Sequence, residues 1–200
     1  MNDRQRSPEI YGNIQIAAFI ILLIWGIHFL NVLLPAELRY YGLRPRQTEG
    51  LWGVAFAPFL HGNIQHLTAN SGVLFVLLIA ALSFSRKQAV AAILVIVVVS
   101  GLAVWMVGKP NTVHIGASGV IFGLIGYLLF IGIFHRRWKA LVFSVAVFLV
   151  YGGVLAGLFV YIPGVSWSGH FFGFLSGVLA AWVTRGKRDR KAIQQRGTGY

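Results

Sequence analysis

Long apolar stretches alternate along the chain with short segments rich in Lys and Arg, and this alternation predicts membrane-spanning helices. A spanning helix needs about 20 apolar residues. The stretch 140–184 is too long for one crossing, and Pro163-Gly164 divides it into two. The apolar segment "GLWGVAFAPFL" is short and contains Pro58, so it predicts an interfacial segment. The pattern therefore predicts six spans, at about 13–34, 66–85, 88–108, 116–134, 140–161 and 167–184.

These spans predict an all-α fold, a polytopic membrane protein built as a six-transmembrane-helix bundle. One membrane domain is expected at 13–184, with an external loop at 35–65. A cytoplasmic N-terminal tail at 1–12 and a basic cytoplasmic tail at 185–200 are expected to flank it.

The composition agrees with a membrane protein and restricts the chemistry. Hydrophobic residues make up 57% of the 200 positions and charged residues only 11%, far fewer than in soluble domains. The absence of cysteine excludes disulfides and thiolate metal sites. The net charge of +12 raises the question of nucleic-acid binding, but the cations form short clusters between apolar stretches. That distribution favours contact with the lipid bilayer over nucleic acid.

The distribution of Lys and Arg predicts the orientation in the membrane. Thirteen of the 17 cations lie on the side of the two termini, and Arg39, Arg44, Arg46 and Lys109 lie on the opposite side. Because cytoplasmic loops carry the excess of Lys and Arg, both termini are expected in the cytoplasm. A six-span chain with short termini is also expected in a bacterial cytoplasmic membrane.

Four polar side chains of the spans fall at a similar depth. Counted at about 1.5 Å per helical residue from the basic residues that end each span, Ser118 lies roughly 27 Å and His170 roughly 22 Å from the cytoplasmic side. On the same count His66 and Asn70 lie roughly 30 and 24 Å from it. Three spans that enter from the outer face therefore bring these residues into one layer.

Small residues recur at helical spacing in the fourth and sixth predicted spans. Small residues at intervals of three or four let helix backbones approach closely in lipid, so these two spans are expected to pack together and to bring Ser118 near His170. The residues concerned are Gly116, Gly119, Gly123 and Gly126 in the fourth span and Gly173 and Gly177 in the sixth, on the face of His170.

This layer has the groups that nucleophilic catalysis requires. An imidazole that accepts the proton of Ser118 would activate its hydroxyl, and His170 is the expected base. All five acidic residues lie outside the predicted spans, so a Ser–His dyad is expected and a carboxylate-containing triad within the layer is excluded. His66, the Asn70 amide and the backbone N–H of Ser118 could stabilise an oxyanion.

The motifs that carry these residues resemble those of the rhomboid intramembrane serine proteases. They are "HGNIQHLTAN" with His66 and Asn70, "GASG" with Ser118, and "GHFFGFLSG" with His170. The resemblance covers most of the chain from Trp52 onward. It implies a serine endopeptidase that cleaves peptide bonds in or near transmembrane segments of membrane proteins, without metal or cofactor.

The resemblance also implies roles for individual residues. Ser118 would be the nucleophile, His170 the general base and acid, and His66 and Asn70 the oxyanion hole. Around them, Gly116, Ala117, Gly119, Phe122, Gly173 and Gly177 would support the site. Two positions depart from the family pattern. Gly53 follows Trp52 where rhomboids often have Arg, and Phe122 stands where they often have a Tyr that stacks on the His.

Other classes of membrane protein fit the sequence less well. A catalytically silent rhomboid-like protein that binds transmembrane helices would be expected to lack Ser118 or His170, and both are present. A transporter tends to carry acids within its spans or repeated halves, and a metalloprotease carries a motif such as H-E-x-x-H. Neither feature occurs in the sequence.

The remaining polar residues near the outer face have simpler interpretations. His61 is expected to orient the external loop or to bond near His66. His114 is expected to be solvated at the outer mouth, and Trp105 to lie in the aromatic belt at the membrane interface. The segment "HGNIQH", residues 61–66, is the hypothetical route by which water reaches Ser118.

Overall fold

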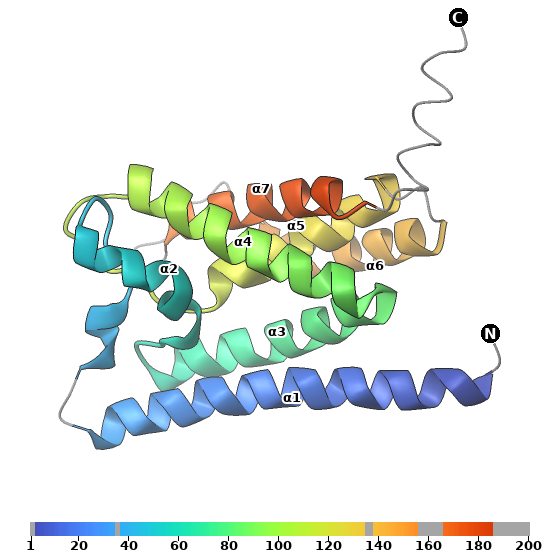
Figure 1. Ribbon diagram of the computed structural model, residues 1–200, viewed down its shortest axis with the longest axis horizontal. Coiled ribbons are helices and arrows are strands. Elements are labelled where there is room, and N and C mark those ends of the chain that lie inside the picture. Colours follow the sequence, from blue (N-terminus) through green and yellow to red (C-terminus); the bar gives the residue numbers. More distant parts are fainter. Residues whose placement is uncertain (1–2, 35–36, 135–137, 156–165, 186–200) are drawn as a thin grey trace, which may run out of the picture.

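The computed structural model describes residues 3–34, 37–134, 138–155 and 166–185, and its regular elements there are helices (Figure 1). The predicted all-α bundle is confirmed. Within these ranges, the long helices are α1 Asp3–Leu33, α3 Ile64–Phe84, α4 Arg86–Val107, α5 Ser118–Phe134, α6 Trp138–Leu155 and α7 Trp167–Val183. Four short elements lie between α1 and α3, namely η1 Leu38–Tyr41, η2 Thr48–Trp52, α2 Gly53–Phe56 and η3 Ala57–Phe59.

Helix α5 is the centre of the bundle. It contacts α3, α4, α6 and α7, and every residue from Val120 to Leu128 is buried. The small and apolar residues of α5 are therefore surrounded by protein on all sides along this stretch. Ser118, the predicted nucleophile, is consequently the first residue of the most enclosed helix among the described residues.

Helices α5 and α7 pack backbone to backbone, as their glycine spacing predicts. A methyl group on Gly173 would collide with the carbonyl oxygen of Gly119, and one on Gly177 with the carbonyl oxygen of Gly123. One turn further along α5, a methyl group on Gly126 would lie 2.5 Å from the carbonyl oxygen of Phe174. The contact persists over several turns and holds the two helices in one register.

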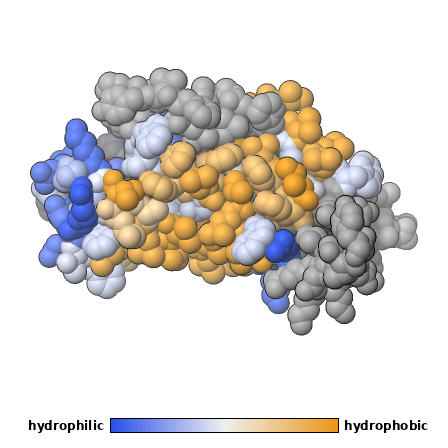
Figure 2. All heavy atoms as spheres, turned by 90° about the horizontal axis from the view of Figure 1, so that it is seen from above, coloured by the Kyte–Doolittle hydropathy of each residue, from blue (hydrophilic) through white to orange (hydrophobic). Residues whose placement is uncertain are grey.

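The surface of the bundle suits a bilayer. The segments Glu9–Leu33, Ile64–Phe84 and Arg86–Val107 are long and apolar enough to cross a membrane, and α5 is a shorter apolar helix. Figure 2 shows hydrophobic residues over the middle of the molecule and hydrophilic residues gathered at the end formed by the loop between α1 and α3, which is the predicted external loop. Exposed apolar patches of this extent are not expected on a soluble monomer. The chain is an integral membrane protein.

Helix α1 begins earlier than the predicted first span. Hydropathy places the start at about 13, whereas the helix already includes Asp3. Its early turns lie against the side chain of Arg86, which donates to the backbone oxygen of Glu9 at 2.9 Å and to Oδ1 of Asn13 at 2.7 Å. Hydropathy marks where a helix becomes apolar, not where it starts, so a polar first segment is missed.

Some predicted segments lie outside the described residues. They are the basic loop at 135–137, the end of the fifth predicted span at 156–161 and most of the C-terminal tail, at 186–200. The loop expected between the fifth and sixth spans is described only from Ser166 onward.

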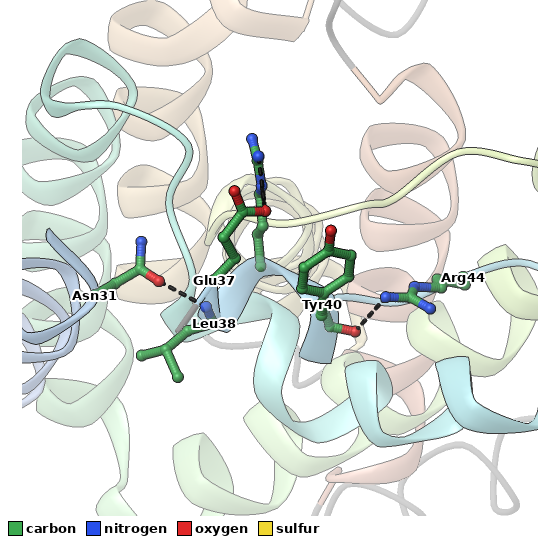
Figure 3. A network of polar contacts seen from close by, with 6 residues as sticks. Asn31, Glu37, Leu38, Tyr40 and Arg44 are labelled. Carbon is green, nitrogen blue, oxygen red and sulfur yellow. Dashed lines mark hydrogen bonds and ion pairs between the residues drawn. The ribbon is translucent and has the colours of Figure 1, made fainter. Parts of the chain in front are cut away.

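The external loop is held by polar contacts over its own backbone and against α1 (Figure 3). Oδ1 of Asn31, near the end of α1, accepts a hydrogen bond from the backbone N–H of Leu38 at 2.7 Å. Nη2 of Arg44 donates to the carbonyl oxygen of Tyr40 at 2.9 Å. These contacts fix the path of the chain toward α2, η3 and the start of α3, where the predicted site residues lie.

Candidate active site

Ser118 is the first residue of α5 and follows a tight turn. Gly116 has a φ of +112°, a conformation that residues with a side chain rarely adopt, and its N–H donates to the carbonyl oxygen of Ala57 at 2.8 Å. Because α5 starts at Ser118, its backbone N–H is among those that a helix leaves without an intrahelical acceptor. A helix N-terminus also favours negative charge. The turn therefore presents a hydroxyl and a backbone donor together.

His170 lies in the first turns of α7 and faces α5. Its ring is buried and stacks on the ring of Phe122, with centroids 4.1 Å apart and an interplanar angle of 15°. Phe122 is one helical turn after Ser118, so both are on one face of α5. Close by, a methyl group on Gly119 would lie 3.5 Å from the carbonyl oxygen of Gly169. The structure thus brings His170 to the part of α5 that carries Ser118.

His66 and Asn70 reach the same turn from α3. A methyl group built on Gly116 would lie 2.8 Å from Nε2 of His66 and 3.5 Å from Nδ2 of Asn70. The His66 ring therefore presses on the backbone just before Ser118, where only a glycine leaves room for it, and the Asn70 amide lies at contact distance from the same residue. The side chain of Asn63 caps α3 by accepting from the N–H of His66 at 2.8 Å, which fixes where the helix starts.

His61 is the partner of Asn70, a contact that the sequence does not reveal. Nε2 of His61 lies 3.0 Å from Nδ2 of Asn70 and accepts from the N–H of Ala117 at 3.4 Å. Because both neighbours are donors, Nε2 must carry the lone pair and Nδ1 the proton. His61 thus ties the Asn70 amide to the turn before Ser118. The expectation that it bonds near His66 is refined, since the two rings also meet edge to face at 5.1 Å.

Burial keeps His61 neutral. It lowers the pKa of His61 to about 4, assisted by the positive charges that His66 and then His28 would carry, while the backbone at Phe59 acts in the opposite direction. At neutral pH the imidazole therefore remains an acceptor for Asn70.

A cavity of about 60 Å³ opens beside Ser118 and is large enough for water. Its lining combines the start of α5, the second half of α4, the short elements α2 and η3, and the start of α7. The segment at 61–66 does not line this cavity, and the entry of water along that segment stays a prediction. The residues that line this cavity include Ser118, Gly119, Ser100, His114, Ser166 and Gly169.

Comparison with known proteins identifies the family. The family model described as the Rhomboid domain matches residues 48–187, more than half of the chain. The chain belongs to the rhomboid family. An uncharacterised protein of Mycobacterium tuberculosis is 37% identical, with 96% of this chain and 84% of the relative covered. An uncharacterised protein of Mycobacterium leprae is 38% identical, with 97% of this chain and 80% of the relative covered. A Bacillus subtilis protein named "Putative rhomboid protease YdcA" is 26% identical over 72% of each chain.

Gly53, which departs from the residue pattern of rhomboids, has a steric explanation. A methyl group on Gly53 would collide with the backbone of Leu43, so this chain leaves no space for the Arg that rhomboids often have there. The external loop is fastened elsewhere. Nη2 of Arg46 donates to the carbonyl oxygen of Gly108 at 3.1 Å, and Nε1 of Trp105 donates to that of Gln47 at 2.8 Å. Trp105, expected only as a belt residue, is thus an anchor of this loop.

The interpretation of His114 as a solvated residue is wrong. Its side chain is half-buried, and both ring nitrogens have hydrogen-bonding partners, Ser166 and Thr112. Burial lowers the pKa of His114. The sequence offered one signal, because His114 lies close before the predicted nucleophile, but its main partner is distant in the chain.

Proposed function

We propose that this protein is an intramembrane serine endopeptidase that uses a Ser118–His170 dyad. Its substrates are membrane proteins, cleaved in or near their transmembrane segments. Membership of the rhomboid family supports a protease-type function in the membrane. The geometry around the first turn of α5 supports the assignment of the individual residues.

The stacking of Phe122 on His170 carries this proposal. It orients the imidazole beside the face of α5 that begins with Ser118, where an exchange of the hydroxyl proton requires it. The close contact of Gly173 with Gly119 sets the spacing of the two helices around this pair. The alternative, a silent protein that binds transmembrane helices, would not require this alignment.

In the proposed reaction, Oγ of Ser118 attacks the scissile carbonyl carbon while His170 accepts the hydroxyl proton. The resulting oxyanion accepts hydrogen bonds from the Ser118 N–H, His66 and Asn70. His170 then gives the proton to the leaving amine, which leaves an ester on Ser118. A water molecule, deprotonated by His170, hydrolyses this ester and restores the serine hydroxyl.

The proposed setting is a bacterial cytoplasmic membrane with both termini in the cytoplasm. Proteins of Mycobacterium and Bacillus among the relatives support a bacterial setting. The excess of basic residues on the side of the termini supports the orientation. The site then faces the outer half of the bilayer, and substrates are single- or multi-span proteins that reach this depth.

Cleavage of a single-span substrate in liposomes tests the proposal. Ser118→Ala and His170→Ala are expected to abolish cleavage and to prevent labelling of residue 118 by a fluorophosphonate probe. Ser176→Ala is the matched control, because Oγ of Ser176 in α7 bonds the carbonyl oxygen of Phe172 in its own helix. Wild-type cleavage by folded Ser118→Ala would reject the dyad. Binding of substrate without any cleavage by the wild type would favour the silent alternative.

A further inference from the structure

The loop between α4 and α5 places His114 where three distant segments meet. Its backbone pairs with Leu43 of the external loop, with N–H to oxygen distances of 2.8 and 3.0 Å. Its ring lies with Nδ1 2.6 Å from Oγ of Ser166 and Nε2 3.0 Å from Oγ1 of Thr112. His114 and Ser166 line the same cavity as Ser118.

The hydroxyl partners determine the protonation of this imidazole. Thr112 donates its hydroxyl proton to the carbonyl oxygen of Lys109 at 2.6 Å, so it accepts from Nε2–H of His114. In the neutral ring Nδ1 then carries the lone pair and accepts the hydroxyl proton of Ser166. The hydrogen bonds around His114 therefore run in one direction, and all donors and acceptors are matched.

Ser166 connects the hydrogen bonds of the His114 ring to the start of α7. As the N-cap residue, it accepts from the N–H of Gly169 through Oγ, and its carbonyl oxygen accepts from the N–H of His170, both at 3.1 Å. A cap of this kind fixes the first turn of a helix. The backbone of His170 is therefore linked through Ser166 to His114.

We propose that His114 is a positioning residue for the dyad, which holds the first turn of α7 so that His170 stays aligned with Ser118. The inference rests on the proposed protease function. His114 makes no contact with the reacting atoms in this role. Through Leu43, the same residue connects the external loop to the alignment of His170.

This role requires the neutral imidazole. Burial lowers the pKa of His114, so the neutral form is the one present at neutral pH. The charged and titratable residues of the segments around it are Arg44, Arg46 and Lys109, and α7 carries His170. When Nδ1 of His114 gains a proton, it becomes a donor and can no longer accept the hydroxyl proton of Ser166. The hydrogen bond between His114 and Ser166 must then reverse its direction.

Three substitutions separate the two bonds of the ring. His114→Asn can place its amide oxygen near the position of Nδ1 and keep the bond from Ser166, whereas His114→Gln mainly replaces Nε2. His114→Phe keeps a planar ring and removes both bonds. We expect kcat for substrate cleavage to fall about tenfold in the Phe and Gln variants and by less in the Asn variant, with KM nearly unchanged. The rate of fluorophosphonate labelling of Ser118 is expected to follow kcat.

The pH profile and a double-variant cycle exclude a merely structural role. The acid limb of kcat/KM is expected to be shallower in His114→Phe, because one fewer group must lose a proton. Combining His114→Phe with Ser166→Ala is expected to cost no more in kcat than the larger single effect, since both act through one contact. Additive losses, or an unchanged acid limb, would overturn the inference.

The outcomes also separate this inference from the proposed function. If Ser118→Ala still cleaves, the dyad itself fails. If Ser118→Ala is inactive while His114→Phe has wild-type kcat and labelling, only the positioning role fails. Should the Phe variant not fold, the Asn and Gln pair decides, because equal kcat values in these two would remove any special role of the Ser166 bond.

Discussion

Gly173 of α7 rests directly on the carbonyl oxygen of Gly119 in α5, with no space for even a methyl group between them. This backbone contact lies one turn from His170 and next to Ser118. It explains why glycine, which weakens an isolated helix, occurs at the centre of the membrane bundle. The distance between the two helices that carry the proposed dyad is set here by backbone atoms, so each methyl group added at the contact must separate them.

Gly173→Ala is therefore expected to lower both stability and activity. Overpacking of this kind costs about 1–3 kcal/mol, and separation of α7 from α5 should reduce cleavage at least about tenfold. Unfolding in mixed micelles and cleavage of a model substrate measure the two effects. Gly26→Ala is the control, because its methyl group would meet nothing within 4 Å. Equal behaviour of the two variants would contradict the role of the contact.

Asn70→Ala is expected to lower kcat by about 10²–10³ without abolishing cleavage, as for the loss of one oxyanion donor. His61→Ala should cost less, about tenfold, because it removes only the partner that orients the amide. Cleavage kinetics of both variants and of the double variant measure this, and the double variant should resemble Asn70→Ala.

Asn13→Ala serves as the control for the loss of a buried Asn. Asn13 bonds Arg86 and Ser83, far along the chain from the site residues. The Asn13→Ala substitution should reduce the stability of the protein and leave kcat unchanged. A larger loss of kcat in His61→Ala than in Asn70→Ala would show that His61 acts by another route.

Introducing the Trp-Arg pair of other rhomboids through Gly53→Arg is expected to destabilise the protein. The side chain would point into the backbone of Leu43, so the external loop or the short helix α2 must move. Thermal unfolding in detergent measures the effect. Ala55→Arg introduces the same side chain at an exposed position of α2 and should be tolerated. A stable, active Gly53→Arg variant would show that the loop can adopt the more common rhomboid arrangement.

The stability of the protein is expected to fall with acidification below pH 6.5. His61 has an unfolded-state pKa of 6.5 and a folded-state pKa of about 4, so between these values only the unfolded chain binds the proton. The contribution of His61 is thus present above pH 6.5 and is lost at up to about 1.4 kcal/mol per pH unit as the pH falls toward 4. Unfolding of the wild type and His61→Gln over this range isolates the effect, and parallel curves would refute it.

Much of the membrane bundle could be predicted, because the bilayer imposes simple rules on the chain. Apolar length identified the helices, and counting along each helix brought Ser118, His66 and His170 to one depth. Glycine spacing predicted the packing of α5 on α7, since small residues at helical intervals mark a close crossing whatever the rest of the fold.

Only the tertiary structure decided the contacts between segments that are far apart in the sequence. Hydropathy cannot show that His61 serves Asn70, that His114 meets Ser166, or that Gly53 leaves no space beside Leu43. These contacts depend on how loops fold over the ends of helices, where neither helical periodicity nor the membrane restricts the chain. The sequence by itself thus determined a helical membrane protein and predicted its candidate site residues in one layer, and packing decided which side chains contact them.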